Sequence, residues 1–249
     1  FDPRSKILFT VLFIAAIFLC KGLVSYGITL LILLMMIGIS KVQPRVFLKG
    51  MKPVVFIVVC TAILNLFYTS GTVLWSWGIL KITEEGIWKA GFMVLRILML
   101  IACTLLLTYT TSPILLTDGL EKLLRPLTKL HFPVHELSMM MSIALRFIPT
   151  LIQETDKIIS AQKARGADFD SGNLIQKAKA LIPILIPLFI SSFRRAEELA
   201  IAMECRCYHG DEGRTSLRQL RYAGRDYGLI VFSIALCAGI VVLRVVFGL

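Results

Sequence analysis

Uncharged apolar runs recur along most of the chain and alternate with shorter segments that carry the charged residues. A hydrocarbon core about 30 Å thick requires about 20 helical residues, so apolar runs of this kind predict membrane-spanning helices. The first run is short and would need its flanking basic side chains to reach the headgroups by snorkelling. The pattern predicts about five spans, at residues 7–20, 22–39, 54–68, 92–110 and 228–243.

The section between the fourth and fifth predicted spans has a different pattern. Charged residues are frequent there, yet apolar residues still recur at helical spacing, which indicates amphipathic helices. One such helix is predicted over residues 136–165, about 45 Å long and bent at Pro149, and a second over residues 174–208. We therefore predict an all-α, polytopic membrane protein with transmembrane helices 1–4 in residues 1–112, amphipathic helices in residues 113–225, and a C-terminal span in residues 226–249.

An apolar stretch at residues 181–193 lies inside the second amphipathic helix. It is too short to cross a bilayer comfortably, so we interpret it as lying in or just under the headgroup layer. The alternative is a sixth span. That topology would place Arg165 and Arg206 on opposite sides of the membrane.

Composition and charge support a membrane location. Hydrophobic residues make up 57% of the chain and charged residues 17%, below the roughly 25% of soluble domains. Lys and Arg are concentrated in residues 41–52 and 122–225, which predicts a cytoplasmic N-terminus and an external C-terminus. The net charge of +11 favours contact with anionic lipid headgroups or an acidic protein partner. No nucleic-acid-binding motif accompanies this charge, so we expect no nucleic acid partner.

Both long amphipathic helices end in an arginine between small residues: Ala164-Arg165-Gly166 and Cys205-Arg206-Cys207. One interpretation is structural, because a terminal arginine complements the helix dipole and a glycine permits a left-handed cap. The other is that each arginine projects its five donors into a groove on another protein. The repetition of the motif at two helix ends favours docking to two partner subunits.

With these motifs, the order of elements resembles the transmembrane T component of energy-coupling factor (ECF) transporters, the vitamin and metal importers of prokaryotes. The opening Asp2-Pro3-Arg4-Ser5-Lys6 is similar to that family's entry to its first span. The two arginine motifs match its two X-Arg-X motifs, although cysteines flank the second arginine here. The resemblance covers essentially the whole chain.

The resemblance implies a non-catalytic coupling subunit in a prokaryotic cell membrane. Arg165 and Arg206 would each insert into one of two cytoplasmic ABC ATPases, and the helices of residues 113–225 would transmit their motion to a separate substrate-binding (S) subunit. The implied ATPase-docking residues are Ala164, Arg165, Gly166, Cys205, Arg206 and Cys207, and the candidate coupling surface is Met140, Met141, Phe189 and Phe193. For the cluster Met139, Met140 and Met141, packing in the protein core is the commoner role, and an adaptable contact surface for partners is the alternative.

Other chemistry has weaker support in the sequence. No phosphate-binding P-loop motif is present, so we expect ATP hydrolysis in partner subunits and no cofactor in this chain. Cys205, Cys207, His209 and Asp211 could suggest a zinc site, but without C-x-x-C spacing we predict no metal. Arg96, the charged residue within the predicted spans, is a functional candidate or a snorkelling side chain.

Two alternative functions remain. An intramembrane hydrolase would need catalytic side chains within the spans, and the predicted spans contain none. A membrane scaffold without transport would tolerate loss of either terminal arginine.

Overall fold

The computed structural model describes residues 1–68, 72–77, 80–130, 133–167, 169, 173–208, 210, 220 and 222–246. The chain forms two compact units, one of residues 1–120 and 220–249 and the other of residues 121–219. In chain order, the elements are α1 (Pro3–Leu19), α2 (Leu23–Ile39), α3 (Pro44–Tyr68), β1 (Val73–Trp77), β2 (Leu80–Thr83), α4 (Glu84–Thr110), α5 (Pro113–Leu124), the 3-10 helix η1 (Arg125–Leu130), α6 (Val134–Ala164), α7 (Leu174–Glu204) and α8 (Gly224–Val246).

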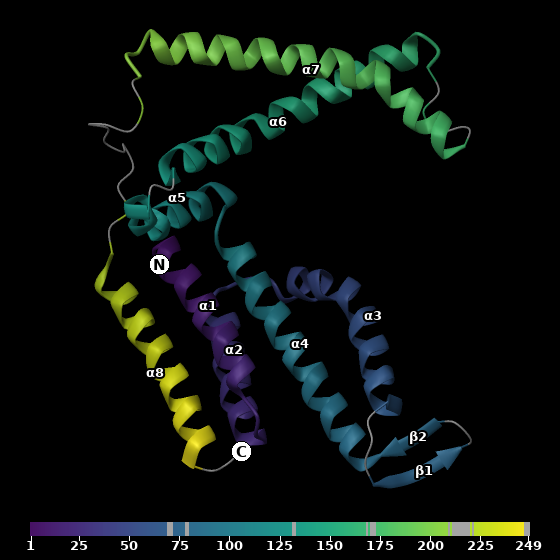
Figure 1. Ribbon diagram of the computed structural model, residues 1–249, viewed down its shortest axis with the longest axis vertical. Coiled ribbons are helices and arrows are strands. Elements are labelled where there is room, and N and C mark those ends of the chain that lie inside the picture. The colour runs from purple at the N-terminus through teal and green to yellow at the C-terminus, as the bar shows by residue number, and fades with distance from the viewer. Residues whose placement is uncertain are drawn as a thin grey trace. The chain divides into compact units, whose positions relative to one another are not determined.

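The first unit is a bundle of long apolar helices. Helix α1 packs against α2, α4 and α8, and α3 runs beside α4 (Figure 1). The core of this bundle includes Phe13, Ile17, Tyr26 and Met99, which are almost fully buried. All five apolar runs of the sequence lie in helices of this unit, which confirms the predicted all-α polytopic class.

Among the described residues, four helical stretches are long and apolar enough to cross a membrane: Pro44–Phe67, Glu84–Thr110, Ile175–Glu204 and Gly224–Val245. Helices α1 and α2 have 17 residues each, about 25 Å of helix, and are short for a span. The stretch within α7 meets the same criteria of length and composition, so our placement of residues 181–193 at the membrane surface stays a prediction.

The segment between α3 and α4 contains two strands that the apolar runs did not predict. Strands β1 and β2 pair antiparallel there, with Trp77 opposite Leu80. Thr83, the last residue of β2, lies opposite Val73 and caps α4, its hydroxyl accepting a hydrogen bond from the backbone N–H of Gly86 at 3.2 Å. The hairpin is a short addition to a helical fold.

A buried polar cluster joins the start of α1 to the start of α8. The Asp2 carboxylate caps α1 by accepting from the backbone N–H of Arg4 at 2.9 Å. Asp226, which is 2% exposed, accepts from the Asp2 N–H at 2.8 Å and from the Ser5 hydroxyl at 2.9 Å. Arg4 in turn donates to the carbonyl of Leu220 at 2.8 Å. The Asp-Pro-Arg-Ser opening therefore fixes the point where the chain re-enters this unit.

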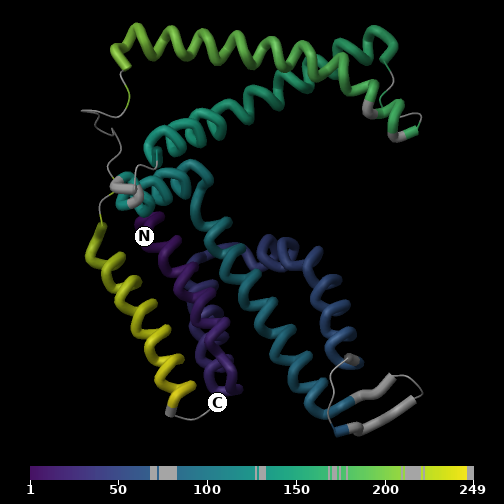
Figure 2. The backbone as a smooth tube through the Cα atoms, in the orientation of Figure 1, coloured from purple at the N-terminus to yellow at the C-terminus, as the bar shows by residue number. Residues whose placement is uncertain are grey.

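The second unit contains the two longest helices. Helices α6 and α7, each of 31 residues, pack against one another and run in opposite directions (Figures 1 and 2). At 1.5 Å per residue each is about 45 Å long, as the sequence predicted for the first of them. Helix α7 ends at Glu204, before the predicted end at Tyr208.

Candidate partner-docking site

The first arginine motif closes α6 in a Schellman turn. The backbone N–H of Gly166 donates to the carbonyl of Lys163, and that of Ala167 to the carbonyl of Gln162, both at 3.0 Å. Gly166 has φ of +86°, in the left-handed region that glycine adopts at little cost. Arg165 is the residue before this reversal, so its side chain leaves the helix where the chain turns away.

The second motif makes the same turn without a glycine. The N–H of Cys207 donates to the carbonyl of Glu204 at 2.8 Å, and that of Tyr208 to the carbonyl of Met203 at 3.1 Å. Cys207 has φ of +56° and thus occupies the position of Gly166 in the first turn. Arg206 is therefore equivalent to Arg165 in backbone geometry, and the cysteine substitution preserves the turn.

All six motif residues are exposed: Ala164, Arg165, Gly166, Cys205, Arg206 and Cys207. Within the described part of the chain, neither guanidinium group makes a hydrogen bond or an ion pair. Because α6 and α7 run in opposite directions, Arg165 and Arg206 lie at opposite ends of the helix pair (Figure 1). Two similar cationic side chains are therefore exposed at the two ends of the helix pair.

An ionic contact fixes the two helices to each other. Glu154 on α6 accepts a short hydrogen bond from the hydroxyl of Ser191 and a 3.3 Å bond from the guanidinium of Arg195, both on α7. The guanidinium of Arg195 also lies over the ring of Phe147, 5.9 Å from its centroid. Sequence periodicity did not identify Glu154, because helical spacing does not show which polar residue faces the neighbouring helix.

A second contact depends on the prolines of α7. Proline has no N–H, so Pro187 cannot donate to the carbonyl of Pro183, four residues earlier in the helix. The side-chain amide of Gln162 on α6 donates to that carbonyl at 3.4 Å. A proline at position 187 of a helix indicates from the sequence alone that the Pro183 carbonyl lacks its helical donor. That the Gln162 amide replaces this donor is visible only in the folded structure. This contact lies three residues before Arg165 along α6.

The candidate coupling surface is accessible. Met140 and Met141 on α6 and Phe189 and Phe193 on α7 are all more than half exposed. The two phenylalanine rings lie 4.9 Å apart between centroids, tilted by 59°. The neighbouring Met139 instead accepts a hydrogen bond from the Tyr208 hydroxyl at 3.1 Å. Core packing is therefore wrong as the role of Met140 and Met141 within this unit.

The remaining candidates have separate positions. Arg96 on α4 donates to the Tyr26 hydroxyl at 2.8 Å and to the Cys20 carbonyl at 3.3 Å, so it joins α4 to both ends of the α1–α2 turn. Cys205 and Cys207 are exposed, and neither forms a disulfide. His209 and Asp211, the other members of the zinc alternative, lie outside the described residues. Among the residues that are described, no three His, Cys, Asp or Glu side chains gather as metal ligands would.

Comparison with known proteins gives matches along the whole chain. The family model CbiQ, cobalt transport protein, matches residues 1–217. The energy-coupling factor transporter transmembrane protein EcfT of Ruminiclostridium cellulolyticum is 52% identical over 99% of this chain and 92% of its own length. The EcfT proteins of Clostridium kluyveri and Bacillus subtilis are 54% and 47% identical, over 97% and 98% of this chain and 88% and 92% of theirs. The chain therefore belongs to the CbiQ family and, within it, to the EcfT transmembrane proteins of energy-coupling factor transporters.

Proposed function

We propose that this multi-pass transporter component is the non-catalytic coupling subunit of an ECF-type ABC importer. In this proposal Arg165 and Arg206 each bind one of two cytoplasmic ATPases, which hydrolyse the ATP. Residues 113–225 form the coupling domain. The imported vitamin or micronutrient is bound and selected by a separate S subunit in the same prokaryotic cell membrane.

The observation that carries the proposal is the pair of equivalent arginine turns. Two exposed guanidinium groups lie at opposite ends of an antiparallel helix pair, each at the residue before a left-handed cap. Small neighbours such as Ala164 and Gly166 leave space around the planar donor groups. Two ATPases that approach one another would act on the two ends at once.

Transmission requires that α6 and α7 move as one body. The contacts of Glu154 with Ser191 and Arg195, and of Gln162 with the Pro183 carbonyl, support this requirement. A displacement applied at Arg165 then reaches α7 through hydrogen bonds. We propose that the exposed methionines and phenylalanines, Met140, Met141, Phe189 and Phe193, contact the S subunit, because such side chains adapt to different partner surfaces.

The proposed orientation places the N-terminus and both arginine turns in the cytoplasm. It follows from the concentration of Lys and Arg in residues 41–52 and 122–225. The same distribution supports our placement of residues 181–193 in the headgroup layer, because a sixth span there would separate the two arginines.

The test is charge reversal at each arginine in the assembled transporter. We expect Arg165→Glu and Arg206→Glu each to weaken copurification of the ATPases by about thirtyfold in affinity, as removal of a central interface arginine does. The double variant should lose substrate uptake. Arg146→Glu is the matched control, because Arg146 is an exposed arginine within α6, away from either turn. Normal assembly and uptake in the double variant would reject the coupling function and favour a scaffold without transport.

A further inference from the structure

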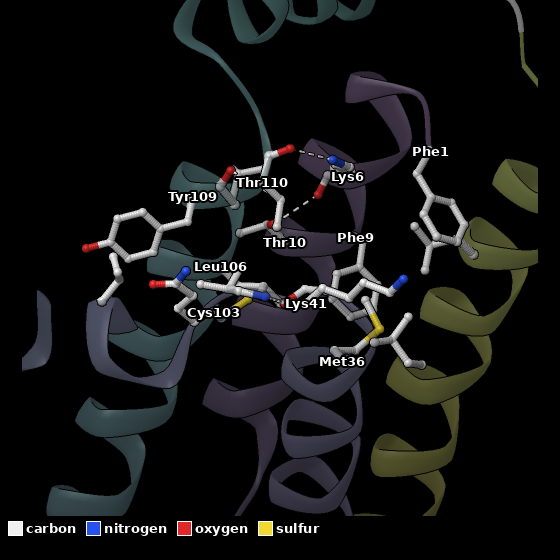
Figure 3. Close-up of a pocket in the computed structure, with 17 residues that line it drawn as sticks. Phe1, Lys6, Phe9, Thr10, Met36, Lys41, Cys103, Leu106, Tyr109 and Thr110 are labelled. Atoms are coloured by element: carbon white, nitrogen blue, oxygen red, sulfur yellow. Dashed lines mark hydrogen bonds between the residues drawn. The ribbon is translucent and has the colours of Figure 1, made fainter. Parts of the chain in front are cut away.

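One cavity of the helix bundle has no role in the proposed coupling. It lies in the first unit and has a volume of about 610 Å³, within the range of roughly 300–1,000 Å³ typical of ligand sites. Its lining comes from the first turns of α1 and α8, the last turns of α2 and α4, and the segment between α2 and α3 (Figure 3). The cavity is thus at the end of the bundle, where membrane spans meet the lipid headgroups.

The lining combines positive charge with apolar surface. Lys6 and Lys41 contribute the charges, and no Asp or Glu is among the 17 lining residues. Phe9, Met36 and Leu106 contribute apolar surface between the helices, and Figure 3 shows Phe9 and Met36 beside Lys41. Positive charge beside apolar surface matches a ligand that has an anionic head and a hydrocarbon tail.

Both lysines can bind an anion. The Lys6 ammonium donates to the Thr110 carbonyl at 2.8 Å and to the Thr111 hydroxyl at 3.3 Å, which leaves one of its three N–H donors. Lys41 is exposed and makes no hydrogen bond or ion pair with any residue in the described ranges. Its φ of +55° is unusual for a side-chain-bearing residue and costs about 1 kcal/mol or more. The turn after α2 thus holds a lysine, rather than a glycine, in a strained conformation at the cavity.

We propose that this cavity binds an anionic phospholipid, with its phosphate between Lys6 and Lys41 and the upper part of an acyl chain against Phe9 and Met36. A free inorganic anion would leave the apolar surface unused, and a zwitterionic lipid would not use the excess of positive charge. Basic pockets between transmembrane helices bind acidic headgroups for this reason. The bound lipid would stabilise the contacts of α1, α2 and α4 at this end of the bundle.

The proposal can be tested on the full chain, purified in detergent and freed of lipid. Native mass spectrometry measures the affinity for dioleoyl phosphatidylglycerol and for dioleoyl phosphatidylcholine. We expect phosphatidylglycerol to bind more tightly, and Lys41→Ala to weaken its binding about fivefold, the contribution of one lysine near an acidic headgroup. Lys41→Arg should retain the affinity. Lys49→Ala is the matched control, an exposed lysine on α3 that does not line the cavity, and should have no effect.

Several results would overturn the proposal. These are equal binding of the two lipids, an unchanged affinity in Lys41→Ala, or an equal loss in Lys49→Ala. Glycerophosphoglycerol, the headgroup without acyl chains, should compete poorly, and equal competition would show that the apolar surface is not used. A photoreactive phosphatidylglycerol should label residues of the cavity such as Met36 in the assembled transporter. Labelling confined to other surfaces would contradict binding of the lipid in this cavity.

Discussion

The link between α6 and α7 gives a quantitative prediction at Glu154. Replacing Glu154 with Ala removes the acceptor for the Ser191 hydroxyl and the carboxylate that pairs with Arg195. The hydrogen bond to a charged group contributes about 1.5 kcal/mol. The ion pair adds about 0.5 kcal/mol, because the Arg195 side chain is 36% exposed and solvent screens the interaction. We therefore expect Glu154→Ala to lower the free energy of unfolding by about 2 kcal/mol.

A double-mutant cycle separates these contributions. Ser191→Ala should cost about 1.5 kcal/mol in the wild-type chain and almost nothing in the Glu154→Ala background, because its partner is already absent. Glu154→Gln should cost about 1 kcal/mol, since the amide oxygen can still accept from Ser191. Thermal unfolding of the purified chain is the assay, with a shift of about 2–4 °C expected per kcal/mol for a protein of this size.

Glu197→Ala is the control for loss of a carboxylate from the same helix pair, because Glu197 is exposed on α7. It should change the free energy of unfolding by less than about 0.5 kcal/mol. An equally small effect of Glu154→Ala would refute the proposed link between the helices. So would a Ser191→Ala cost that is the same with and without Glu154.

Four further substitutions test other parts of the fold by thermal unfolding. Gly166→Ala should destabilise the α6 turn by about 1 kcal/mol, whereas Cys207→Gly should stabilise the equivalent α7 turn by about 0.5–1 kcal/mol, because both positions have positive φ. Stabilisation by Gly166→Ala or destabilisation by Cys207→Gly would contradict the equivalence of the turns. Asp226→Ala leaves several buried donors without an acceptor and should cost about 3 kcal/mol, and a neutral effect would contradict the polar cluster between α1 and α8. Tyr26→Phe removes the acceptor for Arg96 and should cost about 1 kcal/mol; no change in unfolding temperature would show that this contact contributes little.

The sequence allowed the helices to be predicted because their pattern is strong. Apolar runs, one of them interrupted by Arg96, marked the five long helices α1, α2, α3, α4 and α8 of the first unit, and periodic apolar residues marked α6 and α7. The hairpin β1–β2 was missed because its strands are short and its segment was treated as a connection. The end of α7 was predicted at Tyr208, four residues too late. No glycine follows Glu204 directly to mark the end of the helix, because Cys207 occupies the left-handed position of the turn.

The candidate site shows where local patterns suffice and where they do not. Gly166 made the first left-handed cap predictable, but Cys207 has no such preference and is held at positive φ by the hydrogen bonds of the turn. The contact between Gln162 and the Pro183 carbonyl joins residues on different helices, and no single helix pattern predicts it. The cavity beside Lys41 likewise depends on how four helices and a turn meet.

The proposed contacts of the two arginine turns with two different ATPase subunits can be measured directly by photocrosslinking in membranes. One variant carries a photoreactive probe on a cysteine introduced by Ala164→Cys, and the other carries it on Cys205. In each variant all other cysteines of the chain are replaced. We predict that each probe forms an adduct with an ATPase subunit and that the two adducts are with different copies. Adducts confined to this chain or to lipid, or labelling of either probe by a membrane-impermeant reagent from outside the cell, would contradict the account.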